Sequence, residues 1–238
     1  MNKTLLLIFS LVIIIVSIVL FAYRDTWGKT DIEFRIHINE QLVQESVFGE
    51  SPSFAIWLED PVTGIKQTVF VTRRAGAGDW EGKAEVPVAL PLWFEVYKTE
   101  NETKDLPNFE KPASLAVTGA TPKPGYFTTR ARVNSGSEWI CWIEVNLSGD
   151  YNDYYPSFNQ ITLAEDEFGS GQPALIYKAK FKAVEGTVII PEIVGMCVSG
   201  ASDGGLIQPL EGITSATNIF DEIGITVIKP KPKILNTL

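Results

Sequence analysis

Alternation of apolar and polar residues is the feature that most limits what this chain can fold into. Every second residue between Asp31 and Ile38 is apolar, namely Ile32, Phe34, Ile36 and Ile38. Successive side chains of a strand point to opposite faces of a sheet, so this pattern predicts a half-buried strand. His37 falls on the polar phase and is expected to be an exposed strand residue. Further β-rich runs are expected at Ser53–Glu59, Ile65–Thr72, Val88–Tyr97, Phe127–Val133, Trp139–Leu147, Leu175–Ala183, Thr187–Ile190, Ile193–Val198 and Ile225–Ile228.

Turn signals separate these runs. Clusters of Gly, Pro and polar residues stand at Pro61–Gly64, Gly76–Gly78, Pro122–Gly125, Ser148–Asp153 and Ser199–Gly205. Many short strands between such turns predict an all-β fold, an antiparallel Ig-like β-sandwich. No run after the N-terminal segment has a convincing 3.6-residue period, so we expect less than about 10% helix outside that segment.

The domain organisation leaves two possibilities open. The string A-I-W-L-E-D at 55–60 resembles I-C-W-I-E-V at 140–145. Two tandem domains would explain this echo, and so would one composite sandwich with two similar strands. The polar segment 99–112 could be a linker, but it is also short enough to be a surface loop. We favour one composite domain at 31–228, followed by a C-terminal tail at 229–238.

The first 23 residues are predicted to be a transmembrane anchor. From Thr4 to Tyr23 there are 20 residues without a charge, and a helix of that length spans about 30 Å. A cleaved signal peptide is the alternative, but Leu20-Phe21-Ala22 lacks a small residue at the first position of a cleavage site. We expect a retained, single-pass signal anchor at 1–23 and a linker at 24–30. The rest of the chain is then a periplasmic, exported domain outside the cytoplasmic membrane.

Composition and charge exclude several function classes. Of the 238 residues, 45% are hydrophobic, which is enough for a real core. The net charge of −9 argues against a nucleic-acid partner, because phosphate binding needs a basic surface. One histidine rules out a His-rich zinc site, and two cysteines cannot build a disulfide framework or a four-thiolate site. No catalytic constellation stands out, so we expect a protein that is not an enzyme.

Two loop features could bind a ligand or a partner. Carboxylates cluster at 165–167, and Asp150, Asn152 and Asp153 lie in an earlier turn. Such oxygen ligands could hold Ca²⁺, but the spacing matches no EF-hand loop, which favours a solvated acidic loop. The aromatic stretch Y-N-D-Y-Y-P-S-F at 151–158 could stack on sugars or bind a protein. Alternatively, its rings fold back over the end of the sandwich.

Cysteine, serine and tryptophan residues give weaker signals. An exported chain can join Cys141 to Cys197 by a disulfide, but the pairing of the strands is unknown, and two buried free thiols are the favoured alternative. The string S-G-A-S-D at 199–203 is not the strand–turn–helix elbow of a serine hydrolase. Four tryptophans are expected in strands, as core or sheet-face residues, namely Trp57, Trp93, Trp139 and Trp142.

The string V-T-G-A-T-P at 117–122 is the most specific short motif. Thr118, Gly119, Ala120 and Thr121 resemble the Ser/Thr-Gly-Ala-Thr motif of covalently flavinylated extracytoplasmic proteins. That resemblance implies FMN attached to Thr121 through a phosphoester. The fuller motif has an Asp six residues before the acceptor, where this chain has Leu115, and Pro122 is a second departure. An ordinary Gly/Pro turn between strands is the other interpretation.

Several strings in a shared order resemble one bacterial family of exported proteins of unknown function. They are F-A-I-W-L-E-D at 54–60, L-P-L-W at 90–93, V-T-G-A-T-P-K-P-G at 117–125 and G-Q-P-A-L-I-Y at 171–177. The family pattern runs A-V-W-I-E-D, L-P-x-W and V-T-G-A-T-x-x-P-G, and the resemblance covers about Ser53 to Phe181. It implies a periplasmic-type β-sandwich, with some members beside membrane flavin or haem electron-transfer proteins. It carries over no catalytic residues.

These observations predict a membrane-anchored extracytoplasmic accessory or interaction domain that binds another envelope protein. A subunit of an extracytoplasmic electron-transfer system, carrying covalent FMN, is the first alternative. A carbohydrate-binding module, supported only by the aromatic loop, is the second.

Overall fold

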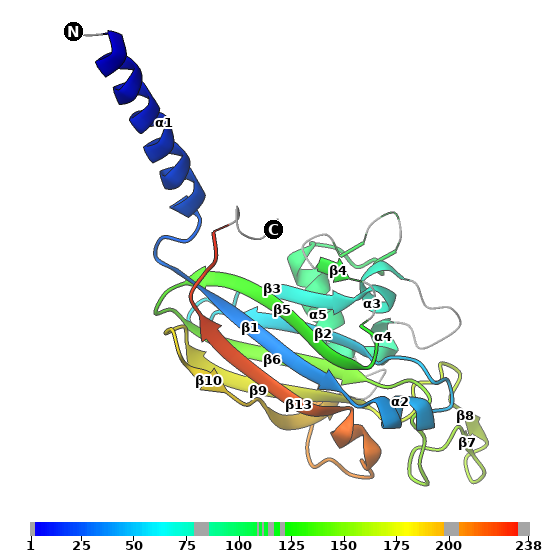
Figure 1. Cartoon of the computed structure of the whole chain (residues 1–238). Coiled ribbons are helices and arrows are strands. Elements are labelled where there is room, and N and C mark those ends of the chain that lie inside the picture. Colours follow the sequence, from blue (N-terminus) through cyan, green and yellow to red (C-terminus); the bar gives the residue numbers. More distant parts are fainter. Residues whose placement is uncertain are drawn as a thin grey trace.

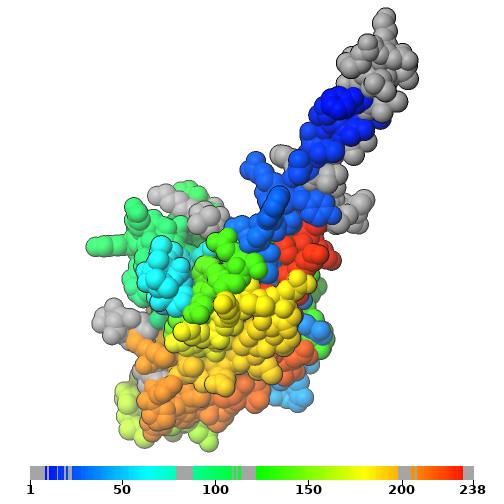
Figure 2. Space-filling model, turned by 90° about the vertical axis from the view of Figure 1, so that its left-hand side faces the viewer, coloured from blue at the N-terminus to red at the C-terminus, as the bar shows by residue number. Residues whose placement is uncertain are grey.

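The computed structural model describes residues 3–78, 86–108, 110, 112–113, 117–119, 122–197 and 205–232. Helix α1 (Lys3–Arg24) leaves one end of the β-domain and stands apart from it (Figures 1 and 2). Large apolar side chains of α1, among them Phe9, Leu11 and Ile14, are exposed. Over the described residues, no helix combines the length and apolar character needed to cross a membrane. The anchor at 1–23 stays a prediction.

Two β-sheets form the body of the protein (Figure 1). The four-stranded sheet has the order β10 (Val188–Ile189), β13 (Phe220–Ile228), β1 (Lys29–Ile38) and β5 (Gly125–Asn134), all antiparallel. The seven-stranded sheet has the order β12 (Leu206–Ile207), β11 (Glu192–Cys197), β9 (Ala174–Lys182), β6 (Glu138–Asn146), β2 (Ser53–Glu59), β3 (Lys66–Thr72) and β4 (Val117–Gly119). Only the short pairing of β3 with β4 is parallel among the described ladders. The predicted antiparallel β-sandwich is confirmed at this level.

The main core lies between the two sheets. The apolar phase of β1 is fully buried, as its alternation predicted, and it packs with Ile225 and Val227 of β13. The facing sheet contributes inward side chains of β2, β6 and β9, namely Phe54, Ile56, Leu58, Cys141, Ile143, Val145, Leu175, Tyr177, Ala179 and Phe181. Burial of these two apolar faces is the main stabilising contribution to a sandwich of this kind.

A layer of helices covers the outer face of the seven-stranded sheet. Helices α3 (Arg73–Ala77), α4 (Val86–Ala89) and α5 (Pro91–Glu100) follow β3 in the chain (Figure 1). They enclose a second core of Ala55, Trp57, Val71, Ala75, Ala89, Leu90, Trp93, Val96, Tyr97 and Ala113. The sheet is therefore buried on both faces where this layer covers it.

The expected strand at Val88–Tyr97 is wrong, because this segment forms α4 and α5. Leu90, Trp93 and Val96 are buried at intervals of three residues, which is the spacing of one helix face. Proline at the first position of α5 also suits a helix start. With α2 (Glu40–Glu45), the described residues contain four α-helices outside α1, of 6, 5, 4 and 10 residues, which is more helix than expected.

The two similar strings are neighbouring strands of one sheet. Strand β2 pairs antiparallel with β6, and Trp57 lies opposite Trp142. Their rings are stacked at 6.3 Å between centroids. Segments before and after residues 99–112 also share the other sheet, because β1 pairs with both β5 and β13.

Candidate functional site

The predicted flavin motif lies only partly within the described residues. Thr118 and Gly119 end the edge strand β4, opposite Val71 and Thr72 of β3. Ala120 and the predicted acceptor Thr121 lie outside the described residues, as do Leu115 and the string at 199–203. The structure therefore does not bear on FMN attachment.

The loops at the end of the sandwich opposite α1 form the candidate site. We call residues 147–171 and 208–215 together the loop end. The first segment joins β6 to β9 and contains the small hairpin β7 (Phe158–Asn159) and β8 (Ala164–Glu165). The second precedes the 3₁₀ turn at Ser215–Asn218 and β13. Figures 1 and 2 show both segments together at the end of the molecule farthest from α1.

A buried polar network holds the two segments together. The amide nitrogen Nε2 of Gln172 donates to Oδ2 of Asp150 (2.8 Å) and to Oγ of Ser215 (2.6 Å). Oγ of Ser215 donates to the second oxygen, Oδ1 of Asp150, at 2.7 Å. The backbone N–H of Thr214 donates to Oε1 of Gln172 at 2.7 Å. Burial raises the pKa of Asp150, and the bond from Ser215 opposes this rise in part. A satisfied buried network of this kind favours one loop conformation.

Asn152 extends the network toward the surface. Its Nδ2 donates to the carbonyl of Gly212 and to Oγ1 of Thr214, both at 2.9 Å. Its Oδ1 accepts from the backbone N–H groups of Tyr154 and Tyr155. One asparagine therefore fixes the aromatic stretch against the segment before β13.

Some rings of the aromatic stretch 151–158 fold back over the loop end, and others are exposed. Tyr155 folds back, and its hydroxyl donates to the carbonyl of Glu211 at 2.9 Å. Tyr151 contacts Asp166, and burial raises the pKa of Tyr151. Tyr154 and Phe158 remain exposed, by 54% and 48%.

The acidic residues of the loop end have separate roles. Asp150 belongs to the buried network, and Asp166 accepts from the backbone N–H of Gly171 at 2.9 Å. Asp153, Glu165 and Glu167 are exposed. In the described part of the chain, no group of three or more His, Cys, Asp or Glu is placed to hold a metal ion.

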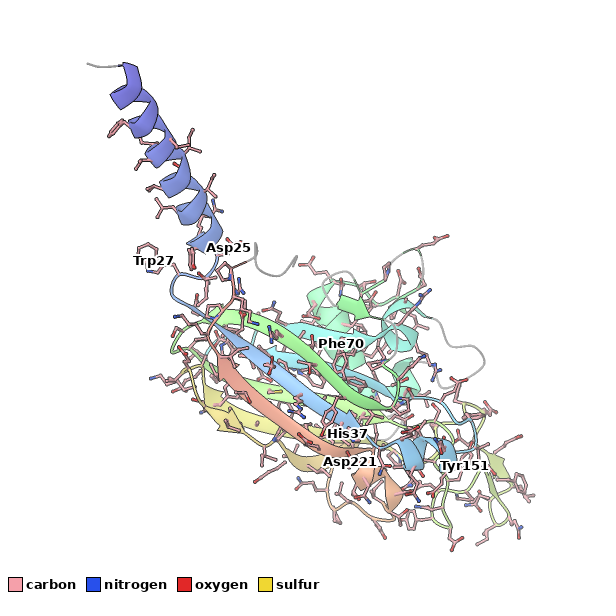
Figure 3. All side chains as sticks on the ribbon, in the orientation of Figure 1. Asp25, Trp27, His37, Phe70, Tyr151 and Asp221 are labelled. Carbon is pink, nitrogen blue, oxygen red and sulfur yellow. The ribbon has the colours of Figure 1, made fainter. Side chains whose placement is uncertain are left out.

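His37 lies on the outer face of the four-stranded sheet, as its phase predicted. Its Nδ1 lies 2.5 Å from Oδ1 of Asp221 (Figure 3). Its ring meets the Tyr126 ring edge-on, with 4.5 Å between the ring centroids. The Tyr126 hydroxyl donates to Oε2 of Glu222 at 2.7 Å. A β-bulge makes Asp221 the extra residue, since His37 pairs with Glu222 and Ile38 with Phe220. Alternation alone could not predict the contact between His37 and Asp221, because a bulge changes which side chains of the strand point to a given face of the sheet.

The two cysteines do not form a disulfide. Cys141 lies opposite Ala179 of β9, whereas Cys197 lies opposite Ala174 at the other end of that strand. The two cysteines are therefore two strand spacings apart across the sheet and five residues apart along β9. A disulfide requires Cα atoms within about 7 Å, so this separation is too large. Burial raises the pKa of both thiols, for Cys197 to about 12 with a further contribution from Glu144. Neither thiol is poised as a nucleophile.

Glu144 is a buried acid that the sequence pattern did not reveal. It lies on β6 with no exposed surface and points to the helical layer. Its carboxyl oxygens accept from the backbone N–H groups of Leu92 (3.0 Å) and Trp93 (2.6 Å), in the first turn of α5. Burial raises the pKa of Glu144 to about 8, and the two N–H bonds oppose this rise. Glu144 therefore attaches α5 to the sheet.

Comparisons with known proteins add no family to these observations. No protein-family model, no curated protein and no solved structure matches the chain.

Proposed function

We propose that this chain is a membrane-anchored extracytoplasmic accessory module with an Ig-like sandwich, which binds another envelope protein through its loop end. The hairpin β7–β8 is the observation that carries the proposal. Ile161 and Leu163 at its tip are 93% and 73% exposed. The two residues are separated by one position in the chain, and contiguous exposed apolar surface marks interaction sites.

The backbone of Leu163 supports the same proposal. Its φ of 56° lies in the left-handed region, which leucine rarely adopts. An exposed leucine in this conformation contributes little packing and adds strain, so stability alone does not explain it. Its side chain is better explained as a contact for a partner.

Charge indicates what kind of partner surface would bind. Asp153, Glu165 and Glu167 are exposed around the hairpin. The partner surface would then carry an apolar centre with basic residues around it, since complementary potentials favour association. The buried Asp150–Gln172–Ser215 network keeps the loop end ordered before binding, which lowers the entropy cost of association.

The anchor supports an envelope location. The described apolar side chains of α1 contact no core of the β-domain and are exposed. A lipid environment would remove this apolar surface from water. The anchor would place the loop end away from the membrane, because it lies at the opposite end of the sandwich (Figure 1). The resemblance to exported proteins near flavin or haem electron-transfer systems suggests where to search for the partner.

The double variant Ile161→Ser/Leu163→Asn tests the docking hairpin. We expect capture of the partner from detergent-solubilised membranes of the native host to fall at least about tenfold, because buried apolar contacts at an interface centre dominate binding. The melting temperature should stay unchanged, since both side chains are exposed and asparagine tolerates positive φ. Quantitative mass spectrometry of the captured proteins measures the effect.

Val62→Ser/Ile65→Ser is the matched control. These residues are also exposed, by 90% and 67%, but they lie in the turn between β2 and β3. That turn is at the other end of the sheet from the loop end. Equal capture by both double variants and the unmodified chain would contradict the proposal. The carbohydrate alternative would instead be supported if the unmodified chain binds a sugar and the Tyr154→Ala variant does not.

Thr121 provides the test of the electron-transfer alternative. We expect no covalent FMN when the chain is produced with a flavin transferase, because Leu115 replaces the usual acid and Pro122 biases Thr121 toward an extended backbone. The measurement is intact mass, together with fluorescence of the denatured band under ultraviolet light. The redox function would be established if the mass rises by that of FMN less water, if Thr121→Ala removes this increase, and if Thr118→Ala retains it.

A further inference from the structure

The end of the β-domain next to α1 is held together by one arginine. Nε and Nη2 of Arg132 on β5 donate to the two carboxylate oxygens of Asp31 on β1, at 2.7 and 3.0 Å. The same guanidinium group donates to the backbone carbonyls of Asp25 (3.4 Å) and Lys231 (3.0 Å). Asp25 directly follows α1, and Lys231 lies in the segment after β13 (Figure 1). Arg132 therefore fixes the base of α1 beside this segment, and we call residues 23–31, 132 and 229–232 together the junction.

The chain between α1 and β1 is a hydrogen-bonded turn. The backbone N–H of Thr26 donates to the carbonyl of Tyr23 at 2.9 Å, and that of Lys29 donates to the carbonyl of Thr26 at 3.2 Å. The carbonyl of Gly28 accepts from the N–H of Ser135, in the turn between β5 and β6, at 2.9 Å. The linker expected at 24–30 is thus bonded to the domain, and these bonds keep the junction turned toward the surroundings of α1.

Two aromatic rings of the junction are exposed. Trp27 is 83% exposed, and Tyr23, in the last turn of α1, is 54% exposed. Figure 3 shows Trp27 projecting outward from the turn between α1 and β1. Neither ring belongs to a core of the domain. Tryptophan and tyrosine are enriched at membrane–water interfaces, where the apolar ring meets lipid and the polar group meets water. Their place at the end of an apolar helix suits such an interface.

The junction is a basic region of an acidic chain. The whole chain has a net charge of −9. Asp31 of the junction is paired with Arg132 at 2.7 Å, and Asp25 lies 4.0 Å from Arg24. The remaining charged residues of the junction are basic, namely Lys29, Lys229 and Lys231. The turn between β9 and β10, which bonds to β13, adds one exposed acid, Glu185, so the local excess stays positive.

Lys229 and Lys231 lie on the surface in an extended segment. Both side chains are exposed. Each lysine precedes a proline, Pro230 or Pro232, and a following proline favours an extended backbone. The bond from Arg132 to the carbonyl of Lys231 holds this segment beside the base of α1. Two ammonium groups are therefore presented next to the exposed ring of Trp27.

We propose that the junction docks on the anionic phospholipid headgroups of a bilayer, with Trp27 at headgroup level and Lys229 and Lys231 on the phosphates. This docking rests on the membrane anchor proposed above and goes beyond it, because an anchor alone specifies neither the lipid nor the orientation of the domain. An anionic surface attracts basic side chains that lie within about a Debye length of it. The loop end then points away from the lipid.

Amine labelling of the full chain in lipid nanodiscs tests the docking. The discs contain phosphatidylcholine alone or equal parts of phosphatidylcholine and phosphatidylglycerol, the reagent is sulfo-NHS-acetate, and peptide mass spectrometry measures each lysine. We expect Lys229 and Lys231 to react at least about threefold more slowly on the anionic discs, because the headgroups attract and cover the ammonium groups. The difference should disappear at about 0.5 M salt, which screens this attraction.

Lys123 is the internal control. It is exposed and precedes β5, whose first residue, Gly125, pairs with Ile38 at the far end of β1. The length of β1 places it roughly 30 Å from the junction, so its reaction rate should be equal on both discs. Lys229→Gln should reduce the slowing at Lys231 at least about twofold, whereas the matched variant Lys123→Gln should leave it unchanged. Lipid brominated next to the headgroup should quench a fluorescence component that Trp27→Phe lacks.

The outcomes separate the docking from the anchor. A chain that does not co-elute with nanodiscs overturns the anchor and this proposal together. A chain that co-elutes, but whose Lys229 and Lys231 react equally fast on both discs, overturns the docking alone and leaves the anchor in place. Equal effects of Lys229→Gln and Lys123→Gln on Lys231 would also overturn the docking, as would quenching that Trp27→Phe leaves unaltered.

Discussion

Glu144→Ala is expected to lower the free energy of unfolding by about 3 kcal/mol near neutral pH, because two buried N–H groups lose their acceptor and a cavity replaces the side chain. Trp93 is fully buried and Leu92 is partly buried, so the N–H groups that bond to Glu144 lie at a covered start of α5. Glu144→Gln should cost less, because its amide oxygen still accepts one of the two bonds. Urea denaturation of the three chains measures the series. Equal stability of the alanine variant and the unmodified chain would contradict the role of Glu144 in attaching α5.

The same residue also predicts the pH dependence of stability. The folded pKa of Glu144 is raised to about 8, above the ordinary value of 4.5 that applies to the unfolded chain. Between these values the unfolded chain releases this proton and the folded chain keeps it, so stability falls as pH rises. The contribution is complete below pH 4.5 and lost by about pH 8. The difference in unfolding free energy between the unmodified chain and Glu144→Gln should therefore shrink from pH 5 to pH 8.5, and a constant difference would contradict the raised pKa.

Gly171→Ala is expected to destabilise the protein by about 3–4 kcal/mol, because a Cβ at this position collides with backbone and φ is positive. The added Cβ would lie 2.6 Å from the carbonyl oxygen of Asp150 and 2.8 Å from its nitrogen, and φ of Gly171 is +69°. Backbone atoms cannot yield as a flexible side chain can. The required shift would also break the bond from the Gly171 N–H to Asp166. Partner capture through the loop end should fall with stability.

Gly136→Ala separates the cost of the positive φ from the cost of the collision with backbone. Its φ of +77° is similar, but nothing lies within 4 Å of the added Cβ. We expect a loss of only about 1–2 kcal/mol there, from the backbone conformation alone. Thermal unfolding followed by circular dichroism compares the two variants. Equal losses would show that the contact with Asp150 does not limit this position.

Part of the candidate site could be found from the sequence. The clustering of tyrosines and carboxylates between two strongly alternating runs indicated the loop that joins β6 to β9. The pattern did not indicate which of these side chains turn inward. Asp150 and Tyr155 are held by Ser215 and Glu211, which are more than fifty residues away in the chain. Such contacts depend on which loops the sheets bring together.

The sequence by itself determined the β-sandwich, because a period of two specifies which side chains of a strand are buried regardless of its neighbours. It predicted β1 closely for that reason, whereas β2 was recognised as a β-rich run and is buried on both faces. Only the tertiary structure decided that Val88–Tyr97, whose proline and three-residue apolar spacing also suit a helix, covers the second face of the seven-stranded sheet. That layer buries Glu144 on a phase which alternation assigns to solvent. Strand order, which alternation does not specify, decided that Cys141 and Cys197 lie apart. Long-range strand pairing decides the burial of Glu144 and the separation of the two cysteines. The covered face of the sheet and the neighbouring strand exist only after the sheets have assembled.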